Sequence, residues 1–265
     1  PQSLRRQRQM CIRDRRSRDF QPVVLAGASF STEFDVATSQ VTSRNVIARL
    51  PGTTHPDETV LYTAHWDHIG MGEPDATGDR IFNGAVDNAS GTAGLLELAR
   101  MFGRAPRTER SIVMISFTAE ESGLLGSEYY AVNPVYPLAR TVGGFNMDSM
   151  NVYGRVAGLG VTGYGQSDFD ERLATAAQAQ GRALVPDHEN AAGTYYRSDH
   201  FPLAKRGVPM AYAGSRGDFR DEPIAVREAA RSEYGAKRYH QAADEWSPDW
   251  DYRGMICLLY TSDAA

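Results

Sequence analysis

The stretch TVLYTAHWDH, residues 59–68, decides the fold. It opens with apolar, β-branched and aromatic residues, which favour a buried strand. It ends with His65, Asp67 and His68, where the strand leaves the sheet. In open α/β sheets, ligands bind at the carboxyl ends of the strands. The stretch therefore predicts a core strand whose end carries polar chemistry.

Apolar segments and helical patterns alternate along the rest of the chain. Strands are predicted at 43–50, 111–119, 141–148, 156–163 and 208–214. Helices are predicted at 91–103, 170–181 and 198–207, and another begins within 249–256. The polar, Arg-rich segment 215–239 is expected to be a loop over the site. This alternation is typical of an α/β fold with a mostly parallel, mixed central sheet flanked by helices on both faces.

Length and composition limit the class of protein. With 265 residues, 42% of them hydrophobic, the chain can form one large domain with a substantial core. A net charge of -5 argues against a nucleic-acid partner, because phosphate binding needs clustered Lys and Arg. The sequence has no run of about 18 apolar residues, so no membrane span is expected. It carries no signal for an oligomeric state.

Four more motifs follow HWDH in fixed order. They read GAVDNASG at 84–91, TAEESGLLGS at 118–127, NMDS at 146–149 and YHQAAD at 239–244. Their acids lie at or just after the end of a predicted strand, or just before a predicted helix. Because these positions meet at one edge of an α/β sheet, residues far apart in the sequence can converge there.

The first motif suits a metal site. His65 is a candidate zinc ligand, because imidazole is a common zinc donor. Asp67 is two residues further on, where it is placed to accept the other ring N–H and fix the tautomer. His68 is expected to point elsewhere, as a bystander or a pocket wall.

The acids of the later motifs suit two metal ions. Asp87 precedes a helix that Asn88 or Ser90 can cap, so its carboxylate is free to bridge two cations. Glu120 and Glu121 would repel each other at a buried strand end unless cations or protons lie between them. We expect one of the two to be a ligand and the other a free base.

Charge balance also favours two metal ions. Asp148 is a further acid at a strand end, and His240 is a further candidate ligand, with Asp244 as its expected partner. Two Zn²⁺ ions carry four positive charges. Asp87, Glu121 and Asp148 with a bridging hydroxide balance them, which leaves the neutral inner shell that a buried site requires.

Taken in order, these motifs resemble metallopeptidase family twenty-eight over roughly residues 43–256, with YYRSDHF at 195–201 and YHQAADEW at 239–246 included. That family includes di-zinc aminopeptidases, glutamate carboxypeptidase and glutaminyl cyclase. The resemblance implies a zinc-exopeptidase fold, which is phosphorylase/hydrolase-like, and two co-catalytic Zn²⁺ ions bridged by Asp87. It assigns one ion to His65, Asp87 and Asp148, and the other to Asp87, Glu121 and His240.

The resemblance also implies roles for residues around the ions. Glu120 would be the general base, and Asp67 would orient the ring of His65. Tyr239 would stabilise the tetrahedral intermediate of peptide hydrolysis. The peptide bond between Asp87 and Asn88 is expected to be cis.

Within this family, a zinc-dependent aminopeptidase acting on peptides is the preferred function. A glutamate-carboxypeptidase-like enzyme would need a cationic patch for a terminal carboxylate, for which Arg197, Arg216 and Arg220 are candidates. A glutaminyl cyclase usually uses one zinc and has Trp-His where this chain has Tyr239 and His240. A non-catalytic, receptor-like relative would lack site residues that are present here.

The two ends of the sequence differ from the rest. Residues 10–15 read MCIRDR and residues 257–265 read CLLYTSDAA, and both resemble translated adapter sequence. We expect 1–15 to be artefactual or disordered, 257–265 to be an artefactual tail, and 16–256 to be a zinc peptidase domain truncated at both ends. Both cysteines lie in the foreign segments, so no disulfide is expected inside. Likeness to secreted bacterial members predicts a secreted or periplasmic location.

Overall fold

The computed structural model describes residues 19, 21, 26–186, 193–220 and 224–264. The chain divides into two units, Pro1–Val41 and Thr42–Ala265. In the first unit, the described residues form no helix or strand, and the expected foreign segment 1–15 lies outside them. The second unit contains the sheet and all of the candidate site residues.

The core of the second unit is a seven-stranded sheet in the order β1-β5-β2-β6-β9-β7-β8. The strands are β1 (Val46–Leu50), β2 (His55–His65), β5 (Arg110–Phe117), β6 (Thr141–Asn146), β7 (Val156–Thr162), β8 (Ala183–Pro186) and β9 (Met210–Phe219). The central strands β5, β2, β6 and β9 run parallel. β1 joins antiparallel at one edge, and β7 pairs antiparallel with β9 before β8. This confirms the mixed, mostly parallel sheet.

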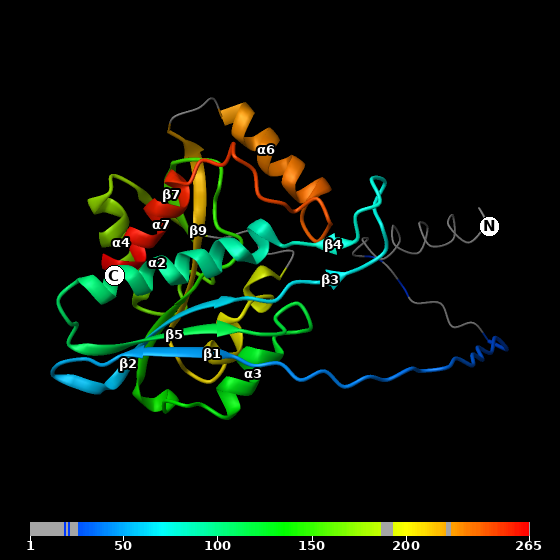
Figure 1. The fold of residues 1–265 in the computed structure, drawn as a ribbon, viewed down its shortest axis with the longest axis horizontal. Coiled ribbons are helices and arrows are strands. Elements are labelled where there is room, and N and C mark those ends of the chain that lie inside the picture. The colour runs from blue at the N-terminus through cyan, green and yellow to red at the C-terminus, as the bar shows by residue number, and fades with distance from the viewer. Residues whose placement is uncertain (1–18, 20, 22–25, 187–192, 221–223, 265) are drawn as a thin grey trace. The chain divides into compact units, whose positions relative to one another are not determined.

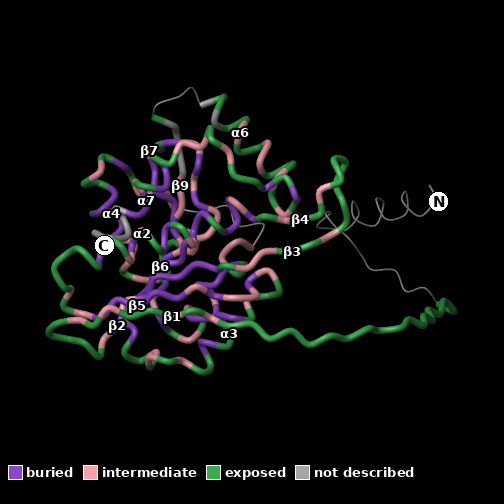
Figure 2. The backbone as a smooth tube through the Cα atoms, viewed as in Figure 1, coloured by how far each residue is buried: buried purple, intermediate pink, exposed green. Residues whose placement is uncertain are grey.

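Helices cover both faces of the sheet, as predicted (Figure 1). They are α2 (Gly91–Arg104), α3 (Leu125–Val132), α4 (Phe169–Ala179), α5 (His200–Ala204), α6 (Ile224–Lys237) and α7 (Arg253–Ala264). Alternate strand residues point to opposite faces. In β2, Tyr62 packs with α2, α4 and α7, whereas Leu61 packs with α3 and α5. The buried tube segments of Figure 2 follow these central strands.

Two parts of the chain differ from the sequence prediction. Segment 215–239 is not a loop, because β9 continues to Phe219 and residues Ile224–Lys237 form α6. The run IAVREAARSE within it is rich in Ala, Glu and Arg, which favour helix over loop. At the other end, residues 257–264 continue α7, where Leu258 and Leu259 are buried in the core. Their foreign origin stays a prediction.

The register of the parallel strands positions the site. His65 at the end of β2 is level with Phe117 at the end of β5, and Thr63 is level with Asn146 at the end of β6. Side chains that follow these three strands therefore meet at one edge of the sheet. Smaller elements complete the unit: the β3–β4 hairpin (Gly70–Met71 and Ile81–Phe82) and the turns η1 (Ala85–Ser90), η2 (Leu138–Arg140) and η3 (Thr194–Tyr196). No described helix is long and apolar enough to cross a membrane.

Candidate active site

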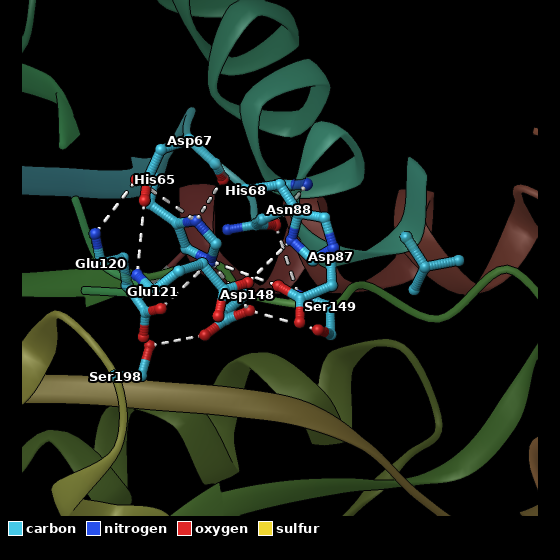
Figure 3. Close-up of polar contacts among 12 residues, drawn as sticks. His65, Asp67, His68, Asp87, Asn88, Glu120, Glu121, Asp148, Ser149 and Ser198 are labelled. Atoms are coloured by element: carbon cyan, nitrogen blue, oxygen red, sulfur yellow. Dashed lines mark hydrogen bonds and ion pairs between the residues drawn. The ribbon is translucent and has the colours of Figure 1, made fainter. Parts of the chain in front are cut away.

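His65 lies at the centre of the site and is only 1% exposed (Figure 3). Its Nδ1 donates to the carbonyl oxygen of Asp67 at 3.0 Å. Its Nε2 is buried without a hydrogen-bond partner and faces carboxylate oxygens of Asp87 and Asp148. Burial disfavours a charged imidazole, but these two carboxylates outweigh it and raise the pKa of His65 to about 12. A positive charge is therefore favoured where Nε2 points.

Asp87 faces two histidines at once. Its Oδ1 lies 3.3 Å from His65 Nε2, and its Oδ2 lies 3.3 Å from His240 Nε2. Burial would raise the pKa of Asp87, but its contacts with the two imidazoles hold that pKa well below its usual range. Glu121 completes this second group, with its Oε2 3.2 Å from His240 Nε2. One carboxylate thus has an oxygen available to each of two cation positions.

The distances between these donor atoms suit zinc. Zn²⁺ holds nitrogen and oxygen ligands at about 2.0–2.2 Å, so two ligands of a tetrahedral ion lie about 3.3–3.6 Å apart. In the first group, His65 Nε2 is 3.3 Å from Asp87 and 3.5 Å from Asp148. In the second, the separations from His240 Nε2 are 3.3 and 3.2 Å. The first group therefore fits an ion in donor type and in spacing, and in the second group His240 lies at a ligand's distance from each of Asp87 and Glu121.

The turn that carries Asp87 is held by its neighbours. The Asp87–Asn88 peptide bond is cis, as predicted. Asn88 Oδ1 accepts the backbone N–H of Gly91 at 2.9 Å, and its amide donates to the carbonyl of Met147 at 3.0 Å. Ser90 instead donates to the carbonyl of Val86 at 2.6 Å. Of the two predicted caps it is therefore Asn88 that binds a helical N–H, and the Asp87 carboxylate is free for the site.

Asp67 acts differently from the sequence prediction. Its carboxylate is 3.8 Å from His65 Nδ1, and the ring hydrogen goes to its backbone carbonyl instead. The carboxylate accepts the backbone N–H groups of Glu120 at 3.0 Å and Glu121 at 3.3 Å. β2 ends at His65, so the alternation of a strand no longer sets the direction of the Asp67 side chain. Asp67 thus holds the segment that carries both glutamates.

Glu120 is the carboxylate that neither group of close contacts uses. It is 8% exposed, and its Oε2 is 4.0 Å from His65 Nε2. Burial and then the negative charge of Asp148 raise the pKa of Glu120 to about 9. Cations bound beside it would act in the opposite direction and favour its ionised form.

Backbone strain is concentrated around these groups. Among the described residues, four that are not glycine have a left-handed backbone: Ala119, Leu124, Ser149 and His240. Ala119 precedes Glu120, Ser149 follows Asp148, and His240 is itself a candidate ligand. Such conformations cost about 1–3 kcal/mol each and are typical of functional sites.

Asp148 is supported by residues that the sequence reasoning did not single out. Ser198 Oγ donates to its Oδ2 at 2.7 Å, and Asn146 Nδ2 donates to Ser198 Oγ at the same distance. Thr63 Oγ1 in turn donates to Asn146 Oδ1 at 2.7 Å. Thr63 lies two residues before His65, and Asn146 lies two residues before Asp148. In a strand, residues two apart point to the same face, so each of them lies on the same face as the candidate ligand that follows it. That spacing is a signal in the sequence that could have identified them.

His68 also belongs to the site. Its Nδ1 lies 2.7 Å from Glu121 Oε1, and its side chain is only 6% exposed. The expectation that it points elsewhere is therefore wrong. Two sets of side chains gather closely enough to hold an ion: His65, Asp87 and Asp148, and His68, Asp87 and Glu121.

Asp244 supports the turn at Asp87 instead of His240, its expected partner. Its fully buried carboxylate accepts the backbone N–H groups of Val86 at 3.0 Å and Asp87 at 3.1 Å. The hydroxyl of Tyr234 donates to the same group at 3.3 Å. Asp244 therefore ties the segment that carries His240 to the turn that carries Asp87.

Replacing Asp244 with Asn should destabilise the fold. The amide has a single oxygen, so one of the two backbone N–H groups loses its acceptor in a buried place, at a cost of about 1–3 kcal/mol. For a domain of this size, each kcal/mol lowers Tm by about 2–4 °C. Thermal unfolding of Asp244→Asn measures this, with the exposed Asp249→Asn as the control. Equal Tm values for the two variants would contradict the assignment.

The groups open into a cavity of about 510 Å³. Its wall includes Tyr239, whose ring stacks on that of His240 at a centroid distance of 3.9 Å. Arg197 and Tyr196 line another part of the wall. A void of this size can admit a peptide end.

Comparison with known proteins identifies the family of the chain. The sequence matches the model of Peptidase family M28 over residues 45–257. It is 33% identical over 181 residues to Aminopeptidase YwaD of Bacillus subtilis, a match that covers 66% of this chain and 36% of that protein. A solved zinc aminopeptidase from Bacillus subtilis is similar at 28% identity and a TM-score of 0.52, over 77% of this chain and 53% of that one. The glutaminyl cyclase of Porphyromonas gingivalis shares the fold at 20% identity and a TM-score of 0.57, over 82% and 74% of the two chains.

The chain spans about a third to a half of the length of these two aminopeptidases. The family model, in contrast, covers most of this chain and includes every candidate ligand from His65 to His240. By its sequence and its fold, the chain belongs to Peptidase family M28.

Proposed function

We propose that this chain is the catalytic domain of a zinc-dependent exopeptidase that removes N-terminal residues from peptides. The observation that carries the proposal is the Asp87 carboxylate, with one oxygen 3.3 Å from His65 and the other 3.3 Å from His240. A carboxylate placed between two sets of ligands is what a pair of co-catalytic ions requires.

Two zinc ions fit the donor atoms. His65, Asp87 and Asp148 would hold one ion, and Asp87, Glu121 and His240 would hold the other. When bound, the pair would lower the pKa of a water molecule and polarise the scissile carbonyl. The remaining chemistry belongs to side chains that are not ligands.

Glu120 is suited to the role of general base. Its carboxylate borders the cavity, is mostly buried and lies 4.0 Å from His65 Nε2. In peptide hydrolysis it would accept a proton from the attacking water and deliver that proton to the leaving amine. The Asp67 carboxylate would keep it in place through the backbone N–H of Glu120.

Tyr239 is suited to stabilising the oxyanion. Burial, together with the charge of Asp87, raises the pKa of Tyr239 to about 12. The hydroxyl therefore keeps its hydrogen near neutral pH and can donate it to the negative oxygen that develops during attack. Stacking on His240 fixes the ring beside the second ion position.

The charge of the cavity favours an aminopeptidase over a carboxypeptidase. Four carboxylates line it, and among its described lining residues Arg197 is the one arginine or lysine. Asp87, Glu121 and Asp148 would be neutralised by the zinc ions, which leaves Glu120 as a free negative charge for an N-terminal ammonium. A C-terminal carboxylate needs a cationic patch instead, which a single arginine does not make. Arg220 donates to the backbone carbonyls of Gln180 and Gly181 instead, and the side chain of Arg216 lies outside the described part.

A substrate panel tests this proposal. We expect aminoacyl anilides with a free amine to be cleaved and their N-acetylated counterparts to be left intact, because the two differ only in the ammonium. A chelator should abolish turnover and added Zn²⁺ should restore it. Release of C-terminal residues from N-blocked peptides would favour a carboxypeptidase. Cyclisation of peptides with N-terminal glutamine, without cleavage, would favour a glutaminyl cyclase.

A further inference from the structure

The ring of His68 is held in a defined orientation beside the second ion position. Its Nδ1 is 2.7 Å from Glu121 Oε1, and the ring meets that of His240 edge-on, with 5.7 Å between the centroids. On the other side lies Gly84, which has a left-handed φ of 61°. A Cβ atom there would lie 2.6 Å from His68 Cγ, so only glycine leaves room for the ring.

The hydrogen bond has one direction. Glu121 is ionised when it serves as a ligand, so its carboxylate accepts and the Nδ1–H of His68 donates. Nε2 of His68 is buried and has no hydrogen-bond partner among the described residues. Glu121 is therefore the polar group that fixes this ring, and the ring in turn fixes Glu121.

The two oxygens of Glu121 have different partners. Oε1 accepts from His68, and Oε2 is 3.2 Å from His240 Nε2. The terminal torsion of a glutamate is broad and roughly two-fold, so a free carboxylate samples many orientations. The His68 bond removes that freedom and leaves Oε2 directed towards the second ion position.

The distance between two donor atoms distinguishes a hydrogen bond from two ligands that share one ion. Two ligands of one tetrahedral zinc lie about 3.3–3.6 Å apart. His240 Nε2 is 3.3 Å from Asp87, within this range, and 3.2 Å from Glu121, just below it. The separation of 2.7 Å between His68 Nδ1 and Glu121 is too short for that and is ordinary for a charge-assisted hydrogen bond. Through its Nδ1, His68 thus contacts a ligand and does not share an ion with it.

We propose that His68 is a positioning residue for the second metal ion, acting through Glu121. The inference rests on the proposed two-metal function and assigns this chain's second histidine of HWDH a role in ion affinity. Groups that orient a ligand typically change metal affinity by 10–100-fold when they are removed.

The test is a titration of metal-free protein with Co²⁺, followed by calorimetry and by the visible absorption of bound cobalt. The wild-type chain should bind two equivalents. His68→Phe keeps a ring but has no donor, so the first equivalent should bind as before and the second about 10–100-fold more weakly. His68→Asn places an amide N–H near the position of Nδ1 and should recover much of the loss. His55→Phe is the control, because His55 is exposed and lies at the opposite end of β2 from His65.

Each other result overturns the proposal. Unchanged binding of the second equivalent to His68→Phe would remove His68 from the site. Equal losses in His68→Phe and His68→Asn would make His68 a direct ligand. A wild-type chain that binds one equivalent would overturn the two-metal function itself, before any variant is compared. His68→Ala, which adds no bulk, replaces His68→Phe if the larger ring prevents folding.

Discussion

Replacing Glu120 with Gln is expected to lower kcat by about 10²–10⁴-fold, the contribution typical of a general base, while both metal ions stay bound. The amide has nearly the same size as the carboxylate, but it cannot accept the proton of the attacking water. Metal binding should survive because Glu120 belongs to neither group of donor atoms and is 4.0 Å from His65 Nε2. The measurement is kcat on an aminoacyl anilide, together with the metal content of the same sample.

The neighbouring residue provides a matched control. Glu121→Gln makes the same chemical change one position further on, in a carboxylate 3.2 Å from His240. It should weaken binding of the second ion, so the loss of turnover should be partly reversed by excess Zn²⁺. Glu120→Gln should show no such recovery. Turnover of Glu120→Gln close to that of the wild type would remove Glu120 from the chemistry.

Replacing Asp87 with Ala is expected to have the largest effect on metal content. Both ion positions share this carboxylate, so the variant should hold at most one ion and bind it weakly. Groups that act as a unit lose most of their effect when one member is removed, so kcat/KM should fall by several orders of magnitude. The metal content of the purified variant and its turnover at saturating Zn²⁺ measure both effects.

Asp148→Ala is the matched variant for Asp87→Ala, because Asp148 would hold only one of the two ions. Asp148 contacts His65 but is not among the contacts of His240. Its loss should affect one ion and leave Asp87, Glu121 and His240 able to hold the other. If Asp87→Ala retained two ions per chain, the bridging role would be wrong.

Much of the fold was predictable because three of the motifs follow an apolar strand. The period of the strands placed His65, Glu120 and Asp148 at one edge, and the parallel register brings β2, β5 and β6 to a common level there. The segment 215–239 differs from the prediction because a polar composition suits a surface helix as well as a loop. A helix with one solvent-facing side also contains many polar residues, so composition alone does not distinguish it from a loop.

The contacts within the site were less predictable because they depend on short turns. Asp67 and His68 follow the end of β2, where strand periodicity no longer sets the direction of a side chain. In the structure Asp67 reaches the backbone of Glu120, and His68 turns to Glu121. Asp244 is likewise placed by long-range packing, against backbone more than 150 residues earlier. Spacing along the sequence carries no information on such contacts.

The central claim is that one carboxylate, Asp87, lies between two zinc ions. Anomalous diffraction at the zinc edge, from crystals grown with Zn²⁺, tests it most directly. We expect two peaks about 3.5–4 Å apart, one beside His65 and Asp148 and the other beside Glu121 and His240, with Asp87 between them. A single peak, or two peaks of which only one contacts Asp87, would contradict it.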